Sequence, residues 1–252
     1  MPHLIANRPR LYDLTKGRPD ARDQFRWETI NAVTYKLGGL VFVAGSVLFF
    51  PQLERWANLG AWLFVVGSVM YLAVNIHDVA EVIRHRRQAA RHPDHTGLAL
   101  NAAKLRLESL AVSTYFLGSL LFIVGSLLFL SEIDRVSAGA WCFIIGSVLF
   151  AVGAAVNILQ IVQAESLVTM QLMNLTAVTY VIGSVLFAVA SVPYLWSFAA
   201  NADKRLVLTY LAAQFVLGSA LFFLGGVFNY SRAYLVIRRH LHKRPAAVSP
   251  AG

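Results

Sequence analysis

The sequence GSVLF occurs three times in this chain, at 45–49, 146–150 and 183–187. Close variants (GSLLF twice, GSALF and GSVMY) occur at 118–122, 125–129, 218–222 and 67–71. All of these copies lie inside the most apolar stretches of the chain. Small residues repeated within apolar segments are typical of membrane helices, because they let two helix backbones approach closely.

The composition requires a lipid solvent for most of the chain. Residues are 57% hydrophobic and 14% charged, whereas globular domains average about 25% charged. Windows of about 17 to 26 residues with few or no charges run over 37–53, 59–76, 110–130, 136–161, 175–200 and 206–228. Each window is long enough to cross a ~30 Å hydrocarbon core as an α-helix. The sequence therefore predicts an all-α membrane protein with six transmembrane helices, the first of which also recruits 30–36.

The six windows form three copies of one hairpin. The first halves read TYKLGGLVFVAGSVLF from Thr34, TYFLGSLLFIVGSLLF from Thr114 and TYVIGSVLFAVASVPY from Thr179. The second halves read LGAWLFVVGSVMY from Leu59, AGAWCFIIGSVLF from Ala138 and, more weakly, LAAQFVLGSALFFLGG from Leu211. A repeat of this kind marks one supersecondary unit. Because each unit has two spans, all three enter the membrane from the same side, as parallel repeats.

Charge gives the orientation. Of the 22 Lys and Arg residues, 18 fall in 1–36, 84–106 and 232–244, which lie on one side of a six-span topology. The positive-inside rule places both termini in the cytoplasm, and the basic excess then contacts anionic lipid headgroups. No nucleic-acid motif accompanies the charge, so no nucleic-acid partner is expected. The polar residues before the first span and the absence of a cleavage site predict insertion without a signal peptide.

The predicted organisation has no separate soluble domain. Its segments are a cytoplasmic N-terminal segment (1–29), the first hairpin (30–78), basic cytoplasmic linker helices (79–109), the second hairpin (110–162), a short loop (163–172), the third hairpin (173–231) and a basic, partly disordered tail (232–252).

The hairpin, with its Thr-Tyr pair, GSxLF, a short loop and GAW before a second GSxLF, resembles the YrhK-like domain family of bacterial membrane proteins. The first two units carry the resemblance, and the third lacks GAW and has a longer loop. The resemblance implies a two-span membrane hairpin and a location in the bacterial inner membrane. It implies no activity, cofactor or site residue.

The glycines recur with a spacing of seven, nearly two helical turns, so each helix presents a stripe of small residues. We predict that these glycines pack helices together, in the set Gly38, Gly45, Gly60, Gly67, Gly118, Gly125, Gly139, Gly146, Gly153, Gly183, Gly218 and Gly225. The alternative is that some of them line a pore through their carbonyl oxygens. The neighbouring serines are expected to bond their own helix or to reach across to another.

One polar position recurs in all three hairpins. Asp78, Asn157 and Asn229 each follow the glycine of a GS pair by eleven residues. They predict a polar ring, or an ion path, at the cytoplasmic mouth of the bundle. The alternative is that all three cap helix ends at the membrane interface.

His77, Glu81 and His85 share one helix face beside Asp78, a pattern that suits proton or cation handling. A solvated helix face beyond the membrane is the alternative, and no metal ion is assigned. Glu28 and Glu108 match each other seven residues before the repeated tyrosine, with Arg26 and Arg106 as nearby pairing candidates.

No nucleophile elbow, phosphate-binding loop or zinc-protease helix is present, so neither an enzyme nor a cofactor is expected. Two functions remain. The first, which the sequence favours, is a channel-like or transporter-like assembly for small ions. The second is a membrane scaffold or accessory subunit that packs against other membrane proteins through its glycine stripes. Either one suits a homo-oligomer or a membrane-protein partner. A dry, closed axis would favour the scaffold, and a continuous water path past the polar ring would favour the channel.

Overall fold

The computed structural model describes residues 26–91, 98–160, 166–197 and 201–242. These residues form helices and turns and no strand, so the all-α prediction is confirmed for them. Most of the predicted N-terminal segment, residues 163–165 of the predicted 163–172 loop and the last part of the tail lie outside the described residues. The rest of that predicted loop is wrong from Leu167 on, where the chain is helical.

Six long helices are joined by short connections. The elements are α1 (Arg26–Val47), η1 (Pro51–Trp56), α2 (Ala57–Arg91), α3 (Leu98–Leu128), α4 (Val136–Gln160), α5 (Leu167–Ser191), η3 (Val192–Leu195) and α6 (Asn201–His242). All six α-helices contain a segment long and apolar enough to cross a membrane. The chain is therefore a multi-pass membrane protein.

Two spans end earlier than their apolar windows. The window 37–53 contains the end of α1 at Val47, and the window 175–200 contains the end of α5 at Ser191. Each helix is followed by a 3-10 turn that begins with a proline at its first or second position. Proline lacks a backbone N–H and clashes with the preceding turn of an α-helix, so apolar composition continues past the point where the helix ends.

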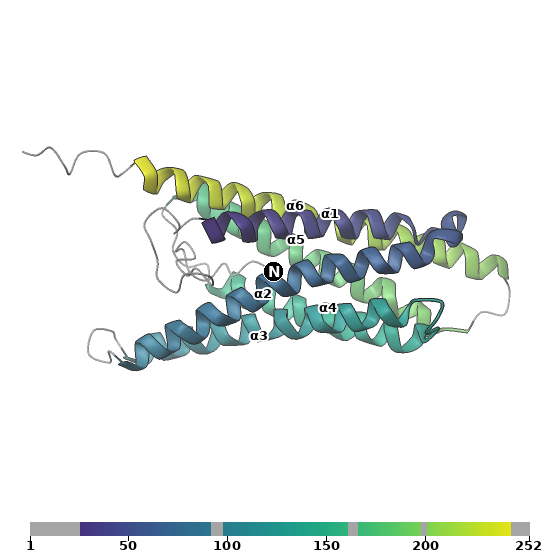
Figure 1. Ribbon diagram of the computed structural model, residues 1–252, viewed down its shortest axis with the longest axis horizontal. Coiled ribbons are helices and arrows are strands. Elements are labelled where there is room, and N and C mark those ends of the chain that lie inside the picture. The colour runs from purple at the N-terminus through teal and green to yellow at the C-terminus, as the bar shows by residue number, and fades with distance from the viewer. Residues whose placement is uncertain (1–25, 92–97, 161–165, 198–200, 243–252) are drawn as a thin grey trace, which may run out of the picture.

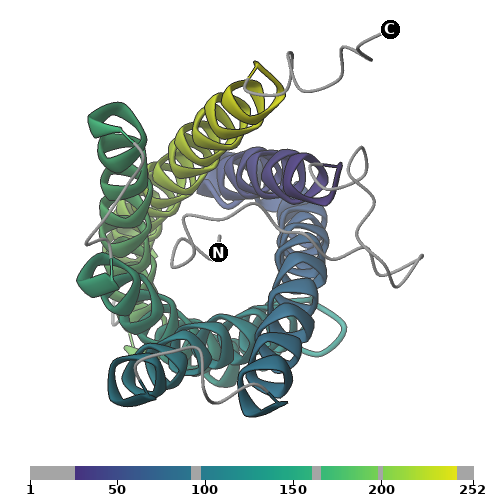
Figure 2. The same ribbon diagram turned by 90° about the vertical axis from the view of Figure 1, so that its left-hand side faces the viewer.

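The six helices close into a ring. Each helix packs mainly against the one before it and the one after it, and α6 returns to pack against α1. Figure 1 shows the helices running along one long axis, and Figure 2 shows the ring seen from its end. The first and last helices are therefore neighbours, although they are the elements farthest apart in sequence.

The two ends of the ring differ. We name the basic end as the end where α1 begins, α2 ends, α3 begins and α6 ends (Figure 1). Its exposed side chains include Arg84, Arg86, Arg87, Arg106 and Arg238. At 1.5 Å per residue, the 42 residues of α6 span about 63 Å, far more than a ~30 Å hydrocarbon core. Helices α2 and α6 therefore extend beyond the apolar part of the ring at this end.

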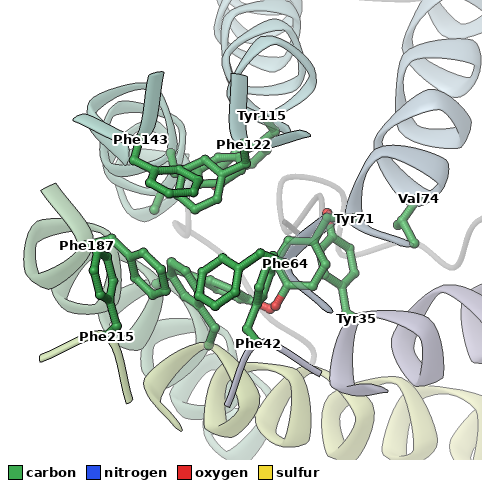
Figure 3. Packing of buried hydrophobic residues seen from close by; sticks show 14 of the residues in the cluster. Tyr35, Phe42, Phe64, Tyr71, Val74, Tyr115, Phe122, Phe143, Phe187 and Phe215 are labelled. Carbon is green, nitrogen blue, oxygen red and sulfur yellow. The ribbon is translucent and has the colours of Figure 1, made fainter. Parts of the chain in front are cut away.

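Phenylalanines from the three odd-numbered helices meet inside the ring. Phe42, Phe122 and Phe187 occupy matching positions in the three predicted hairpins, seven residues after the repeated tyrosine. Their ring centroids are 5.7 to 6.4 Å apart, and their side chains are at most 1% exposed. Figure 3 shows these rings pointing into the space between the helices.

The even-numbered helices supply a second set of the same kind. Phe64, Phe143 and Phe215 also occupy matching positions, and their centroids are 6.0 to 6.5 Å apart. The two sets contact each other, for example at 5.1 Å between Phe122 and Phe143. We call these six residues the aromatic plug. They fill the middle of the ring with apolar side chains (Figure 3).

Within a hairpin, glycines of each helix face aromatic rings of the other helix. A methyl group on Gly38 would lie 2.7 Å from the ring of Tyr71, and one on Gly67 would lie 3.0 Å from Phe42. The second hairpin repeats this exchange, with Gly118 against Phe150 and Gly146 against Phe122. The glycines therefore lie where two helices meet, and the ring's interior is lined by aromatic side chains instead of glycine carbonyls.

Neighbouring hairpins contact each other through the residue after the glycine. The Oγ atoms of Ser46 in α1 and Ser219 in α6 are 2.8 Å apart, and the amide of Asn75 in α2 donates to Ser119 in α3 at 2.8 Å. Other bonds stay within one helix: Ser46, Ser68, Ser126 and Ser184 donate to a carbonyl one turn earlier. At Ser46, Ser119 and Ser219 the GS pair thus serves two contacts, glycine within a hairpin and serine between hairpins.

The outer surface is apolar and carries tryptophans at one end. Exposed leucine, isoleucine and valine side chains occur along all six helices. Trp56, Trp62, Trp141 and Trp196 are each about half exposed and lie near the end opposite the basic end. Tryptophan is enriched at the boundary between lipid and water, so the GAW tryptophans suit an interfacial position.

Candidate functional site: a buried polar layer

The aromatic spacing continues into polar residues at the basic end of the ring. Seven residues before the repeated tyrosine, the odd-numbered helices carry Glu28, Glu108 and Met173. Seven residues beyond Tyr71, Phe150 and Phe222, the even-numbered helices carry Asp78, Asn157 and Asn229. We call these six residues the polar layer, of which Met173 is the one apolar member. All of them are at most 2% exposed, so the sequence places polar groups where the helical repeat requires buried side chains.

An ion pair joins the first and last helices within this layer. Arg232 Nη2 lies 2.5 Å from Glu28 Oε1, and both side chains are about 3% exposed. Arg232 also donates to Asn229 Oδ1 from Nε at 3.2 Å and from Nη2 at 3.1 Å. Glu28 thus pairs with Arg232 in the fold. The sequence had suggested the nearby Arg26 as its partner.

A second group surrounds His77. Its Nδ1 lies 3.0 Å from the amide nitrogen of Asn31, and its ring stacks on Trp27 with centroids 5.3 Å apart. One ligand atom from each of His77, Asp78 and Glu81 can be chosen so that all three lie within 4.8 Å of one another. His77 and Asp78 are 1% exposed, and Glu81 is half-buried.

A chain of hydrogen bonds links the first two hairpins between the aromatic plug and the basic end. The Tyr35 hydroxyl donates to Asn75 Oδ1 at 2.6 Å, and Asn75 Nδ2 donates to Ser119 Oγ and to the backbone oxygen of Tyr115. Asn157 Nδ2 in turn donates to the Tyr115 hydroxyl at 2.6 Å. Asn157 is therefore tied to the repeated tyrosine of its own hairpin.

The helix bounds decide between the interpretations of the recurring polar position. Asp78 and Asn229 lie well inside their helices, since α2 continues to Arg91 and α6 to His242. The alternative that these two cap helix ends is therefore wrong. The alternative of a solvated face is also wrong for His77, which is fully buried. The side chain of His85 lies outside the described side chains.

Acidic side chains outnumber guanidinium groups among the buried residues of this region. Among the described residues, the buried ionisable side chains of acidic or guanidinium type are Glu28, Asp78, Glu108 and Arg232, three carboxyl groups against one guanidinium. Buried carboxylates must be neutralised by protons, by cations or by strong hydrogen bonds. Chemically, the layer is suited to holding protons or a cation, and none of its described geometry places a nucleophile beside a general base.

Several residues that build the site were not predicted from the sequence. Trp27, Asn31 and Arg232 were not singled out, and neither were Gly39 and Gly226, which bring α1 and α6 together. A methyl group on Gly39 would lie 2.7 Å from the Phe223 Cα, and one on Gly226 would lie 2.7 Å from the Lys36 Cα. The available signal was the pair of GG doublets, at 38–39 and 225–226, one on each of the helices that close the ring.

Comparison with known proteins agrees with the hairpin pattern. The family described as YrhK-like protein matches the chain twice, over residues 25–83 and 105–162. These segments contain α1 with most of α2, and most of α3 with all of α4. No curated protein and no solved structure matches the chain. The first two hairpins therefore each match the YrhK-like family, as repeated units of one kind.

Proposed function

We propose that this chain is a non-catalytic scaffold or accessory subunit of a bacterial inner membrane, and that its bundle is sealed to ions. The observation that carries the proposal is the aromatic plug, because six buried phenylalanines in mutual contact leave the axis to apolar side chains. An ion crossing such a region would lose its hydration without receiving any polar ligand in exchange.

The partner surface in this proposal is the basic end. The predicted packing glycines make their close contacts inside the chain, so they are not available to a partner in the way the sequence suggested. The extended ends of α2 and α6 instead carry exposed arginines such as Arg86, Arg87 and Arg238. These suit anionic lipid headgroups and an acidic surface on a membrane-protein partner.

The topology in the proposal is three parallel copies of one hairpin with both termini in the cytoplasm. The equivalent phenylalanines of the three hairpins meet in triads, as three like units around one axis would place them. The described ends of α1 and α6 lie at the same end of the bundle (Figure 1). Its arginine content makes that end the cytoplasmic one under the positive-inside rule.

A cation channel is the second candidate, because the polar layer favours it. Three buried carboxyl groups lie at the basic end of the ring, as acidic rings do at the mouths of cation channels. In this alternative the aromatic plug is a hydrophobic gate, and conduction requires its two phenylalanine triads to separate.

Flux measurements in liposomes separate the two candidates. Purified protein is reconstituted beside the Asp78→Asn variant, which takes the residue that the other two hairpins carry at that position. We expect Na⁺, K⁺ and proton flux no faster than in protein-free liposomes. Flux through the wild type that Asp78→Asn alters would overturn the sealed scaffold and establish the channel.

The partner surface is tested separately by photo-crosslinking in the native membrane. A photoreactive residue replaces exposed Arg86 at the basic end, or Val69 on the lipid face as the control. We expect a discrete protein adduct from position 86 and none from position 69. Equal adducts at both positions, or none at either, would contradict a partner surface at the basic end.

A further inference from the structure

The first hairpin departs from the other two at a group of positions that meet in space. Alignment of the repeats on their Thr-Tyr and GS pairs matches Tyr35 with Tyr115 and Tyr180, and Ser68 with Ser147 and Ser219. Four departures form this group: Trp27 where the others have Leu107 and Leu172, Asn31 against Ala111 and Thr176, His77 against Val156 and Phe228, and Glu81 against Gln160 and Arg232.

These four residues come from two helices and contact one another. Trp27 stacks on His77, Asn31 lies 3.0 Å from its Nδ1, and Glu81 brings a carboxylate oxygen near it together with Asp78. The first hairpin also departs at Lys36, Gly39 and Asn75, which contact α6 or α3 instead. The four departures around the His77 imidazole form a group that the other two hairpins do not repeat.

We propose that His77, Asp78 and Glu81 bind one divalent transition-metal ion of the Zn²⁺ or Mn²⁺ class. One imidazole nitrogen and two carboxylate oxygens form a donor set that these ions accept. Tetrahedral bonds of about 2.0–2.2 Å place ligand atoms roughly 3.4 Å apart, so the three ligand atoms, now within 4.8 Å, converge by small side-chain rotations. His77 and Glu81 are one helical turn apart on the same face.

The surroundings of His77 suit a metal ligand. Because Asn31 occupies Nδ1, the other ring nitrogen, Nε2, is the ligand atom. With a metal on Nε2 the proton moves to Nδ1, and Asn31 turns its amide to accept that proton through oxygen. A metal-binding histidine is commonly held by such a second hydrogen bond. The Trp27 ring, nearly parallel to the imidazole at 16°, fixes its plane.

The charge of the layer favours a cation at this place. The buried guanidinium of Arg232 is bonded to Glu28, at the interface of α1 with α6. Asp78 adds a further buried carboxyl group on α2. A divalent ion bound there would offset the negative charge of the Asp78 and Glu81 carboxylates.

Metal binding to the purified full-length protein tests the proposal. The protein, freed of any affinity tag and treated with a chelator, is titrated with Zn²⁺ and with Mn²⁺ by calorimetry in nanodiscs. The matched variant is His77→Val/Asp78→Asn/Glu81→Gln, which carries the residues that the second hairpin has at these positions. It keeps the remaining histidines, so binding elsewhere on the chain persists in both proteins.

We expect the wild type to bind one more equivalent of metal than the triple variant, with nitrogen and oxygen ligands and no sulfur in its X-ray absorption spectrum. The Asn31→Ala variant, which takes the residue of Ala111, should bind that equivalent about 10- to 100-fold more weakly. Equal stoichiometry in the wild type and a folded triple variant would overturn the proposal. If the triple variant does not fold, two results together would overturn the proposal: Asn31→Ala binds the metal as tightly as the wild type, and the metal bound to the wild type has a sulfur ligand.

Discussion

Glycine is required in this protein wherever an aromatic ring from the paired helix reaches the backbone. The packing is reciprocal, since the Tyr71 ring packs against Gly38 and the Phe42 ring packs against Gly67. Each ring is directed inward and also covers a neighbouring glycine, so the residue that lets two helices approach and the residue that fills the axis belong to one contact. Lipid supplies no hydrophobic drive for helix association, and close packing of this kind replaces it.

The glycines differ in what a side chain would meet, which gives a prediction. A methyl group on Gly39 would lie 2.7 Å from backbone atoms of Phe223, whereas one on Gly125 would meet side-chain atoms at 3.1 Å. We expect Gly39→Ala to lower the free energy of unfolding by about 1–3 kcal/mol through overpacking. Gly125→Ala should be near neutral, because its smaller clash is offset by helix propensity of about 1 kcal/mol. Equal unfolding midpoints of the two variants in mixed micelles would contradict this difference.

The aromatic plug gives a second prediction at the residue scale. Phe187 is fully buried and its ring contacts Phe42, Phe122 and Phe222. Phe187→Ala leaves a cavity that rigid helices cannot fill, and we expect a loss of about 3–5 kcal/mol in unfolding free energy. Val185→Ala, two residues earlier and 49% exposed, is the control and should change the unfolding midpoint little. A comparable loss in both variants would mean that Phe187 contributes only generic helix stability.

At the scale of the elements, α1 and α6 are held by a close backbone approach and a buried ion pair. The GG doublets bring their backbones together, and the Glu28–Arg232 pair joins them in the polar layer. At the matching places the interface between α2 and α3 has the Asn75–Ser119 hydrogen bond instead. The contact that closes the ring has no covalent loop to enforce it, so specific interactions must replace one.

The ion pair predicts a non-additive double mutant. Glu28→Met, which takes the residue of Met173, leaves the Arg232 guanidinium buried without this carboxylate, and such a loss costs about 3–5 kcal/mol. Glu28→Met/Arg232→Leu removes both charges and should be more stable than Glu28→Met alone. Unfolding by denaturant in mixed micelles measures the wild type, Glu28→Met, Arg232→Leu and the double variant. A double variant as unstable as the sum of its single variants would show that the pair is not coupled.

At the scale of the whole molecule, the sequence predicted features that belong to single helices, but it did not predict the contacts between distant helices. Apolar length and the seven-residue spacing predicted the helices and their packing faces, because both properties belong to single helices. Two helices end near prolines inside apolar windows, and the hydrophobicity of these windows does not mark the helix ends. The seven-residue spacing does not indicate which helix each packing face contacts. It therefore predicted neither the closure of the ring nor the contact between Glu28 and Arg232, which are 204 positions apart. The recurrence of a polar residue at one position was visible in the sequence, but its burial was not.

The closed ring is open to a direct covalent test. The Oγ atoms of Ser46 and Ser219 are 2.8 Å apart, a spacing that a disulfide can replace after slight adjustment. In a Cys142→Ala background, Ser46→Cys/Ser219→Cys should oxidise in the membrane and join the first helix to the last. The covalently closed chain should migrate faster on a non-reducing denaturing gel, and reductant should abolish the shift. The control is Ser46→Cys/Ser147→Cys, on α1 and α4 at opposite sides of the ring, which should stay reduced. Oxidation of the control pair, or reduced thiols in the first pair, would show that the helices are not ordered around one closed ring.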